Sequence, residues 1–186
     1  MFEVRDKPQM VEQALLVRIC FDKREEAEAR SLLAELEELV GTLGIKVGAT
    51  QLAFSREQHK KFLCGTGKAA EVAELAREIG CDCIVFDNEL APSQQREWEE
   101  LADMTVIDRE EVILDIFARR AQTKEPTLQV ELARMQYALP RMARMWQHHD
   151  REGGGGAGGS AAARGMGEQQ IEVDRRLARR RIDRIR

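Results

Sequence analysis

The most constraining feature of this sequence is its last third, residues 127–186, where two segments with helical periodicity flank a run of glycine and alanine. Six apolar residues of the first segment recur at alternating spacings of four and three: Leu128, Leu132, Met135, Leu139, Met142 and Trp146. This spacing is typical of the seam of a coiled coil. The second segment offers a matching stripe: Ile171, Ala178, Ile182 and Ile185. We therefore expect a long antiparallel helical hairpin, with the Gly-rich residues 153–167 as its tip loop.

Upstream of this hairpin, apolar runs that suit buried strands alternate with segments that carry a helical stripe. The runs cover residues 14–21, 45–54, 83–87 and 104–107. Such alternation indicates an α/β fold with a mainly parallel sheet and flanking helices. Pro126 disfavours helical backbone in the residue before it, so we expect it to separate this part from the hairpin. The predicted domains are an α/β subdomain over 1–122 and the hairpin over 123–186.

The charge distribution is asymmetric along the chain. Residues 1–110 contain 14 Lys+Arg and 23 Asp+Glu, whereas residues 111–186 contain 15 and 10. An acidic body with a basic arm is a common layout for proteins whose arm touches nucleic acid, although a solvated helix face explains the same composition. Three of the four cysteines, Cys20, Cys64 and Cys83, lie in apolar runs and fit small buried hydrophobes in a reducing compartment. With no signal peptide and no apolar run of about 18 residues, we expect a cytoplasmic protein without a membrane span.

Two stretches of the α/β part invite a ligand-binding interpretation. Residues 62–68, FLCGTGK, look like a strand, a Gly-rich turn and the start of a helix. A phosphate loop requires G-x-x-x-x-G-K-[ST], which this stretch does not match, so we interpret it as a tight turn in which glycine tolerates unusual dihedral angles. Asp87, Asn88 and Glu89 follow a strand at the position where α/β folds often bind ligands, but capping and turn formation explain them equally well.

Longer motifs in the second half resemble the N-terminal region of the HflX family of ribosome-associated GTPases. They include Val106-Ile-Asp-Arg109, Ile113-Leu-Asp-Ile-Phe-Ala118, Gln129-Val-Glu-Leu-Ala133 and Leu139-Pro-Arg141. Asp87-Asn-Glu-Leu90 and the Arg164-Gly165 and Gly167-Glu168 pairs also match. The resemblance covers roughly residues 83–182, and the first 60 residues agree only in layout.

This resemblance implies an α/β subdomain, then a helical hairpin, then a G domain. It also implies the large ribosomal subunit and its 23S-type rRNA as partners, ribosome splitting or rescue as the role, and a monomeric protein. The chain has no phosphate-loop motif and stops at Arg186, where the family's G domain would follow. We therefore expect no catalytic residue, cofactor or metal in this chain, and expect GTP and magnesium to belong to a G domain outside it.

The chemistry of the hairpin tip suits RNA. A run of glycines allows close backbone approach, arginines suit phosphate contact, and histidines can stack on unpaired bases. The residues that we expect to contact nucleic acid are Arg144, His148, His149, Arg151, Arg164, Gly165, Gly167, Arg175 and Arg176. Trp146 lies on the apolar stripe and is better explained by seam packing.

Two other functions fit parts of the sequence. One is a nucleotide-binding α/β domain that uses Gly65-Thr-Gly-Lys68, which a titration with labelled ATP or GTP would reveal. The other is a coiled-coil module that pairs with a helix of another protein. Sedimentation with and without RNA separates this second alternative from an RNA-binding hairpin.

Overall fold

The computed structural model describes residues 11–145, 176, 180 and 182–183. The chain divides into two compact units, Met1–Val112 and Ile113–Arg186. This division falls within a helix, and the domain boundary expected at residues 122 and 123 stays a prediction.

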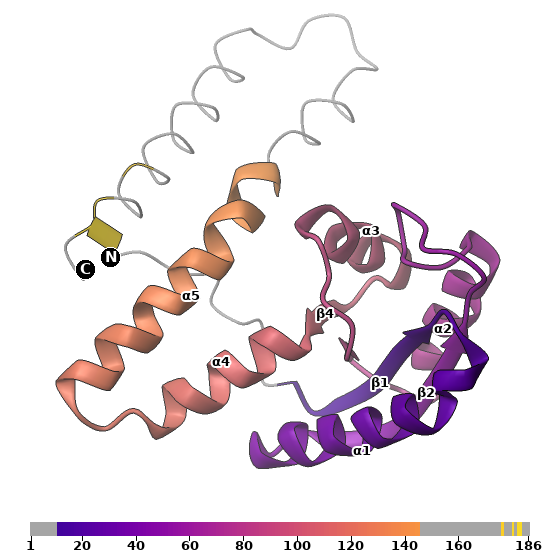
Figure 1. Cartoon of the computed structure of the whole chain (residues 1–186), viewed down its shortest axis with the longest axis horizontal. Coiled ribbons are helices and arrows are strands. Elements are labelled where there is room, and N and C mark those ends of the chain that lie inside the picture. Colours follow the sequence, from indigo (N-terminus) through magenta and orange to yellow (C-terminus); the bar gives the residue numbers. More distant parts are fainter. Residues whose placement is uncertain (1–10, 146–175, 177–179, 181, 184–186) are drawn as a thin grey trace, which may run out of the picture. The chain divides into compact units, whose positions relative to one another are not determined.

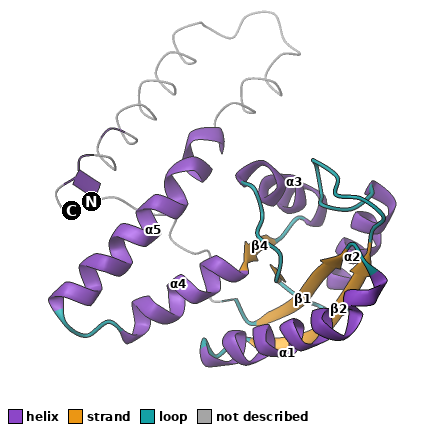
Figure 2. Cartoon of the chain, viewed as in Figure 1, coloured by secondary structure: helices purple, strands orange, loops and turns teal. Residues whose placement is uncertain are grey.

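The first unit is built on a four-stranded parallel sheet (Figure 1, Figure 2). Its strands are β1 (Gln13–Cys20), β2 (Lys46–Phe54), β3 (Cys83–Phe86) and β4 (Thr105–Asp108), in the order β2-β1-β3-β4. The helices between them are η1 (Lys23–Glu25), α1 (Glu26–Thr42), α2 (Thr66–Glu78) and α3 (Pro92–Ala102). The α/β fold with a parallel sheet and flanking helices is confirmed.

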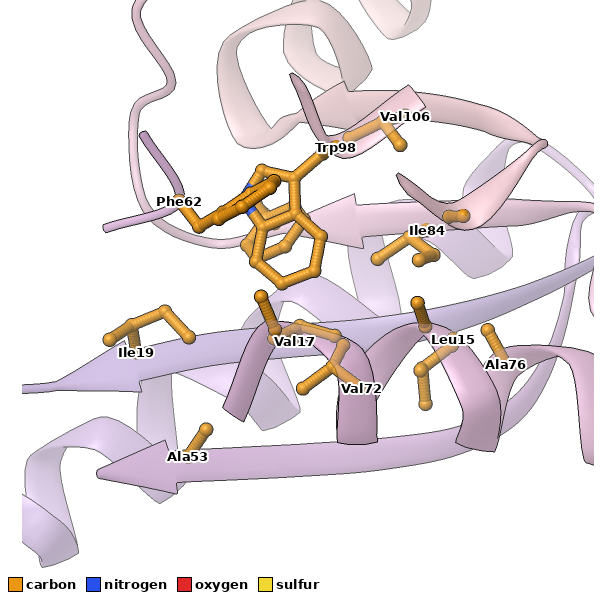
Figure 3. Close-up of a cluster of buried hydrophobic side chains, with 14 of the residues drawn as sticks. Leu15, Val17, Ile19, Ala53, Phe62, Val72, Ala76, Ile84, Trp98 and Val106 are labelled. Carbon is orange, nitrogen blue, oxygen red and sulfur yellow. The ribbon is translucent and has the colours of Figure 1, made fainter. Parts of the chain in front are cut away.

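Alternation along β1 explains how both faces of the sheet are covered. Leu15, Val17 and Ile19 belong to one buried cluster, which also contains Trp98 of α3 and residues of α2 (Figure 3). The residues between them point to the other face because successive side chains of a strand alternate. Helix α1 contacts β1 and β2 and buries a stripe that includes Leu36. The continuous apolar runs of the sequence thus reflect strands that are buried on both faces.

Local capping signals set several boundaries of these helices. The Asp22 carboxylate accepts a hydrogen bond from Arg24 N at the start of η1. The Asp108 carboxylate accepts one from Glu111 N, 3.2 Å away, at the start of α4 (Arg109–Arg120). Gly44, with a φ of 75°, follows α1 in the left-handed region that favours glycine.

The second unit contains most of α4 and all of α5 (Lys124–Met145). Phe117 of α4 is 56% exposed. Helix α5 begins before Pro126, which occupies its first turn. Proline is tolerated there because the first backbone N–H groups of a helix have no acceptor within it. Pro140 lies inside α5, as expected.

Helix α5 has the amphipathic character that its spacing predicts. Leu128, Leu132 and Leu139 are half-buried, whereas Gln129 and Gln136 are exposed. In the second predicted helix, Ile182 of the expected seam is buried and Arg180 is exposed. Most of that segment and the whole tip loop lie outside the described residues, so the hairpin itself stays a prediction.

Candidate functional site

The structure places only two of the nine predicted RNA-contact residues. Arg176 is an exposed helical residue, and Arg144 lies in the last turn of α5. The other seven lie outside the described residues: His148, His149, Arg151, Arg164, Gly165, Gly167 and Arg175. Their proximity to one another therefore stays a prediction.

Two arginines along α5 have partners within their own unit. Arg134 forms an ion pair with Asp115 of α4, whose side chain is 8% exposed. The Arg141 guanidinium lies 3.4 Å from the centre of the Tyr137 ring, and its Nη1 donates to Tyr137 O over 3.2 Å. A guanidinium stacked on an aromatic ring is held by a cation–π attraction. Arg134 and Arg141 thus both make contacts within the second unit.

The order of the strands creates a topological switch point between β1 and β3, where open α/β sheets commonly bind ligands. Here, side chains of the protein itself fill this edge. Ile19 N donates to Asn88 Oδ1 over 2.7 Å, and Asn88 Nδ2 donates to Ile19 O over 3.1 Å. The amide group of Asn88 continues the pairing of β1 and β3 beyond the end of β3. It has a structural role, which is one of the two interpretations that the sequence allowed.

Asp87, the residue before Asn88, is the centre of a buried ion-pair network. Its side chain is 2% exposed and accepts hydrogen bonds from Arg18 and, over 3.1 Å, from Arg109 Nη1. Arg109 also pairs with Glu35 of α1. Burial lowers the pKa of Arg109, but the hydrogen bonds to Asp87 and Glu35 outweigh this effect and raise the pKa. The network joins four separated parts of the chain and leaves a permanent positive charge on Arg109.

The Gly-rich stretch does not form a phosphate loop. Gly65 precedes α2 with a φ of −63°, Gly67 lies within the first turn of the helix, and Lys68 pairs with Glu71 one turn on. The residue with the unusual dihedral angle is Leu63, whose φ is 62°. The expectation that glycine supplies this conformation is therefore wrong. Leu63 is buried, so contacts of its side chain with the core can stabilise it there.

A hollow of about 560 Å³ lies at the opposite edge of the first unit, where the strands begin. Arg77 and Asp82 line it together with Cys81 and Met104. Arg77 donates to Leu101 O over 2.9 Å, and Asp82 accepts from two backbone N–H groups at the start of β1. Of the three charged residues that line the hollow, Arg77 and Asp82 are thus occupied in holding the fold, and Asp103 is the third. In the part of the chain that the structure describes, no three metal-ligating side chains come together.

Among the described residues, no helix combines the length and apolar character that crossing a membrane requires. All four cysteines are buried, including the three that the sequence places in apolar runs, and none is in a disulfide. Burial raises the pKa of the Cys64 thiol to about 11, so Cys64 is poorly suited to act as a nucleophile.

Comparisons with known proteins match both parts of the chain. Residues 30–118 match the family described as GTP-binding GTPase N-terminal, and residues 120–186 match the GTP-binding GTPase middle region. The chain is 66% identical over its full length to the GTPase HflX of Akkermansia muciniphila, covering 43% of that protein. It is 41% identical to the GTPase HflX of Escherichia coli, over 94% of this chain and 39% of the relative. The chain thus spans about two fifths of the curated relatives' length.

Solved structures show the same fold at lower sequence identity. A crystal structure of SsGBP in complex with GDP superimposes with a TM-score of 0.59 at 22% identity, over 94% of this chain and 42% of the other. A GTP-binding protein from Sulfolobus solfataricus, also with GDP, gives a TM-score of 0.54 at 20% identity, over 94% of this chain and 43% of the other.

Proposed function

Because the chain belongs to the HflX family of GTP-binding GTPases, we propose that it forms the region of such a GTPase that docks on the ribosome. In this proposal the predicted hairpin and its Gly-rich loop contact the 23S-type rRNA of the large subunit, and the complete protein splits or rescues stalled ribosomes. GTP and magnesium bind to a part of the protein outside these 186 residues. The protein acts in the cytoplasm as a monomer.

The observation that carries the proposal is the continuous helix α5, which runs for 22 residues toward the Gly-rich segment. At about 1.5 Å per residue, such a helix spans about 33 Å. It can therefore carry a small loop far from its own first turn. The glycines of that loop leave few side chains to obstruct its approach into a narrow RNA cavity.

The charge distribution supports RNA as the partner of this arm. The positive excess lies in residues 111–186, whereas residues 1–110 carry a negative excess. Eleven of the 15 basic residues in the arm follow Leu139, in the segments that flank the loop. A basic arm on an acidic body is oriented by the field of a polyanion so that the arm meets it first.

Co-sedimentation of the chain with purified large ribosomal subunits over a KCl series tests the proposal. We expect binding that weakens steeply with salt, because each phosphate contact releases a counterion. Arg151→Gln and Arg164→Gln, next to the glycines, should both weaken it. Arg30→Gln on α1 is the control, since Arg30 pairs with Glu26 and lies in the acidic unit. The proposal would be refuted if the affinity for the large subunit did not depend on the KCl concentration, or if all three substitutions weakened binding equally.

A further inference from the structure

The acidic first unit contains one basic segment, residues 56–68, which joins the end of β2 to the first turn of α2. It holds four of the 14 Lys and Arg residues of positions 1–110 but only one of their 23 Asp and Glu residues. Arg56, His59 and Lys60 of this segment are all exposed. The segment is therefore a local positive surface on a negative body, where a polyanion can approach favourably.

Two of the four cations in this segment are available to a ligand. Lys61 pairs with an acidic residue of α3, and Lys68 pairs with one of α2. Arg56 and Lys60 form no ion pair with any residue that the structure describes. These two side chains can therefore bind a phosphate without first breaking an ion pair of the protein, and charge-assisted hydrogen bonds to phosphate are the stronger kind.

The base of the segment is anchored in the core. Leu63 N donates to His59 O over 3.0 Å, and His59 N donates to Leu63 O over 3.1 Å, which closes a tight turn. Phe62, Leu63 and Cys64 are buried, and the Phe62 ring meets Trp98 edge-on with centroids 5.3 Å apart (Figure 3). The left-handed backbone of Leu63 costs about 1–2 kcal/mol, which this packing must offset. Non-glycine residues held in such conformations concentrate at functional sites.

Further contacts hold the exposed part of the turn against its neighbours. Gln94 Nε2 of α3 donates to His59 O over 3.4 Å, and Ser55 N donates to Cys20 O of β1 over 3.0 Å. A Cβ placed on Gly65 would lie 4.0 Å from His59 Nε2, so the imidazole lies beside the start of α2. The turn and the start of α2 thus present one surface, and no acidic side chain lies in the first turn of that helix.

We propose that residues 56–68 form a second RNA contact, in which Arg56 and Lys60 bind backbone phosphates of structured RNA. The identification of this RNA as that of the large subunit rests on the proposed function. Phosphate contacts fix the orientation of a protein on RNA without reading its sequence. The anchored turn suits this role because a rigid loop loses little conformational entropy on binding. Its role is to orient the sheet unit on the RNA surface.

Binding of the whole chain to large subunits, and to a fluorescein-labelled rRNA stem-loop by anisotropy, tests this contact over a KCl series. Lys60→Gln should weaken binding about three- to tenfold and lower the slope of log K against log salt by about 0.7–0.9, and Arg56→Gln should add a similar loss. Lys46→Gln is the matched control, because Lys46 is an exposed lysine at the opposite end of β2. It should change neither quantity.

The variants separate this contact from the hairpin. If Lys60→Gln and Lys46→Gln bind equally well and Arg164→Gln binds more weakly, the second contact is refuted and the proposed function is still supported. Loss in Lys60→Gln with Arg164→Gln unaffected supports the second contact and overturns the hairpin as the docking element. Absence of wild-type binding to either RNA overturns both. Binding of labelled ATP that Lys60→Gln abolishes would identify a mononucleotide site and overturn the RNA contact. Unchanged melting temperatures show that the variants are folded.

Discussion

Replacing Asp87 by alanine should destabilise the sheet unit strongly, because this acid is shared by two arginines. The Asp87 side chain is 2% exposed, and those of Arg18 and Arg109 are each 24% exposed. Arg18 Nε already lies buried without a hydrogen-bond partner in the described part of the chain. Removing one partner of a buried ion pair costs about 3–5 kcal/mol. Because both guanidinium groups reach solvent and Arg109 keeps Glu35, we expect the lower end, about 3 kcal/mol.

Urea unfolding followed by tryptophan fluorescence measures this loss. The chain has two tryptophans, so a Trp146→Phe background leaves Trp98, which is fully buried in the sheet unit, as the sole reporter. The urea concentration at the unfolding midpoint should fall, whereas the slope of the unfolding free energy against urea concentration should not change. The melting temperature should drop by about 6–12 °C. Glu71→Gln is the control, since its ion pair with Lys68 is exposed and contributes less than about 1 kcal/mol.

An Asp87→Ala variant whose free energy of unfolding lies within about 0.5 kcal/mol of that of the Glu71→Gln control would contradict this prediction. That result would mean that the network contributes no more than an exposed pair. Asp87→Asn refines the comparison, because it keeps the shape and one acceptor oxygen while removing the charge. It should lie between the wild type and the alanine variant.

Three further stability predictions use the same fluorescence assay. Gly48→Ala should destabilise by about 1 kcal/mol, because its Cβ would lie 2.8 Å from Gln13 Nε2 and would displace this group from its hydrogen bond to Ile79 O. A Cβ on Gly67, in the first turn of α2, has no atom within 4 Å, so Gly67→Ala should raise the free energy of unfolding by up to about 1 kcal/mol. If the Gly48 and Gly67 substitutions changed stability in the same direction, the difference in packing around the two glycines would not explain their effects. Burial raises the pKa of Cys64 from 9.0 to about 11, so folding favours the neutral thiol. This stabilisation is complete below pH 9 and is lost as the pH rises toward 11, by up to about 2–3 kcal/mol. The free energy of unfolding of Cys64→Ala should fall less than that of the wild type between pH 9 and 11. If the two proteins lost stability equally over this range, the Cys64 thiol would be excluded as the cause.

Much of the α/β fold could be predicted because its signals are local. The apolar run at residues 14–21 differs from β1 by one residue at each end, and the predicted strand at 104–107 matches β4 equally closely. Asp22 and Asp108 cap helices through hydrogen bonds that span only two or three residues. A capping residue and the N–H group that it binds are neighbours in sequence, so their pairing can be read without knowledge of the fold.

The details that required the structure depend on residues far apart in the chain. Arg18 and Asp87 are 69 positions apart, and Arg109 and Glu35 are 74 positions apart. Phe62–Cys64 has the composition of a strand, yet it forms the buried base of a turn that packs against Trp98 of α3. Leu63 adopts a backbone conformation that its own preferences oppose, because tertiary packing outweighs a local cost of about 1–2 kcal/mol.

The candidate sites divide in the same way. The sequence indicated the basic character of the arm, and its family motifs indicated RNA contact near the glycines, although most of those residues lie outside the described part of the chain. The basic turn at residues 56–68 was missed. The number of basic residues there could be counted in the sequence. The ion pair of Lys61 and the exposure of Lys60 could be seen only in the structure.

By itself, the sequence determined the alternation of strands and helices, the amphipathic helix α5 and the split between an acidic body and a basic arm. These features follow from residue periodicity and composition, which act over a few positions. Only the tertiary structure decided that the strands lie in the order β2-β1-β3-β4, and that Asp87 and Asn88 close the sheet edge instead of leaving it open to a ligand. The physical reason is that ion pairs and packing form between surfaces that folding brings together, and their partners are not neighbours in the chain.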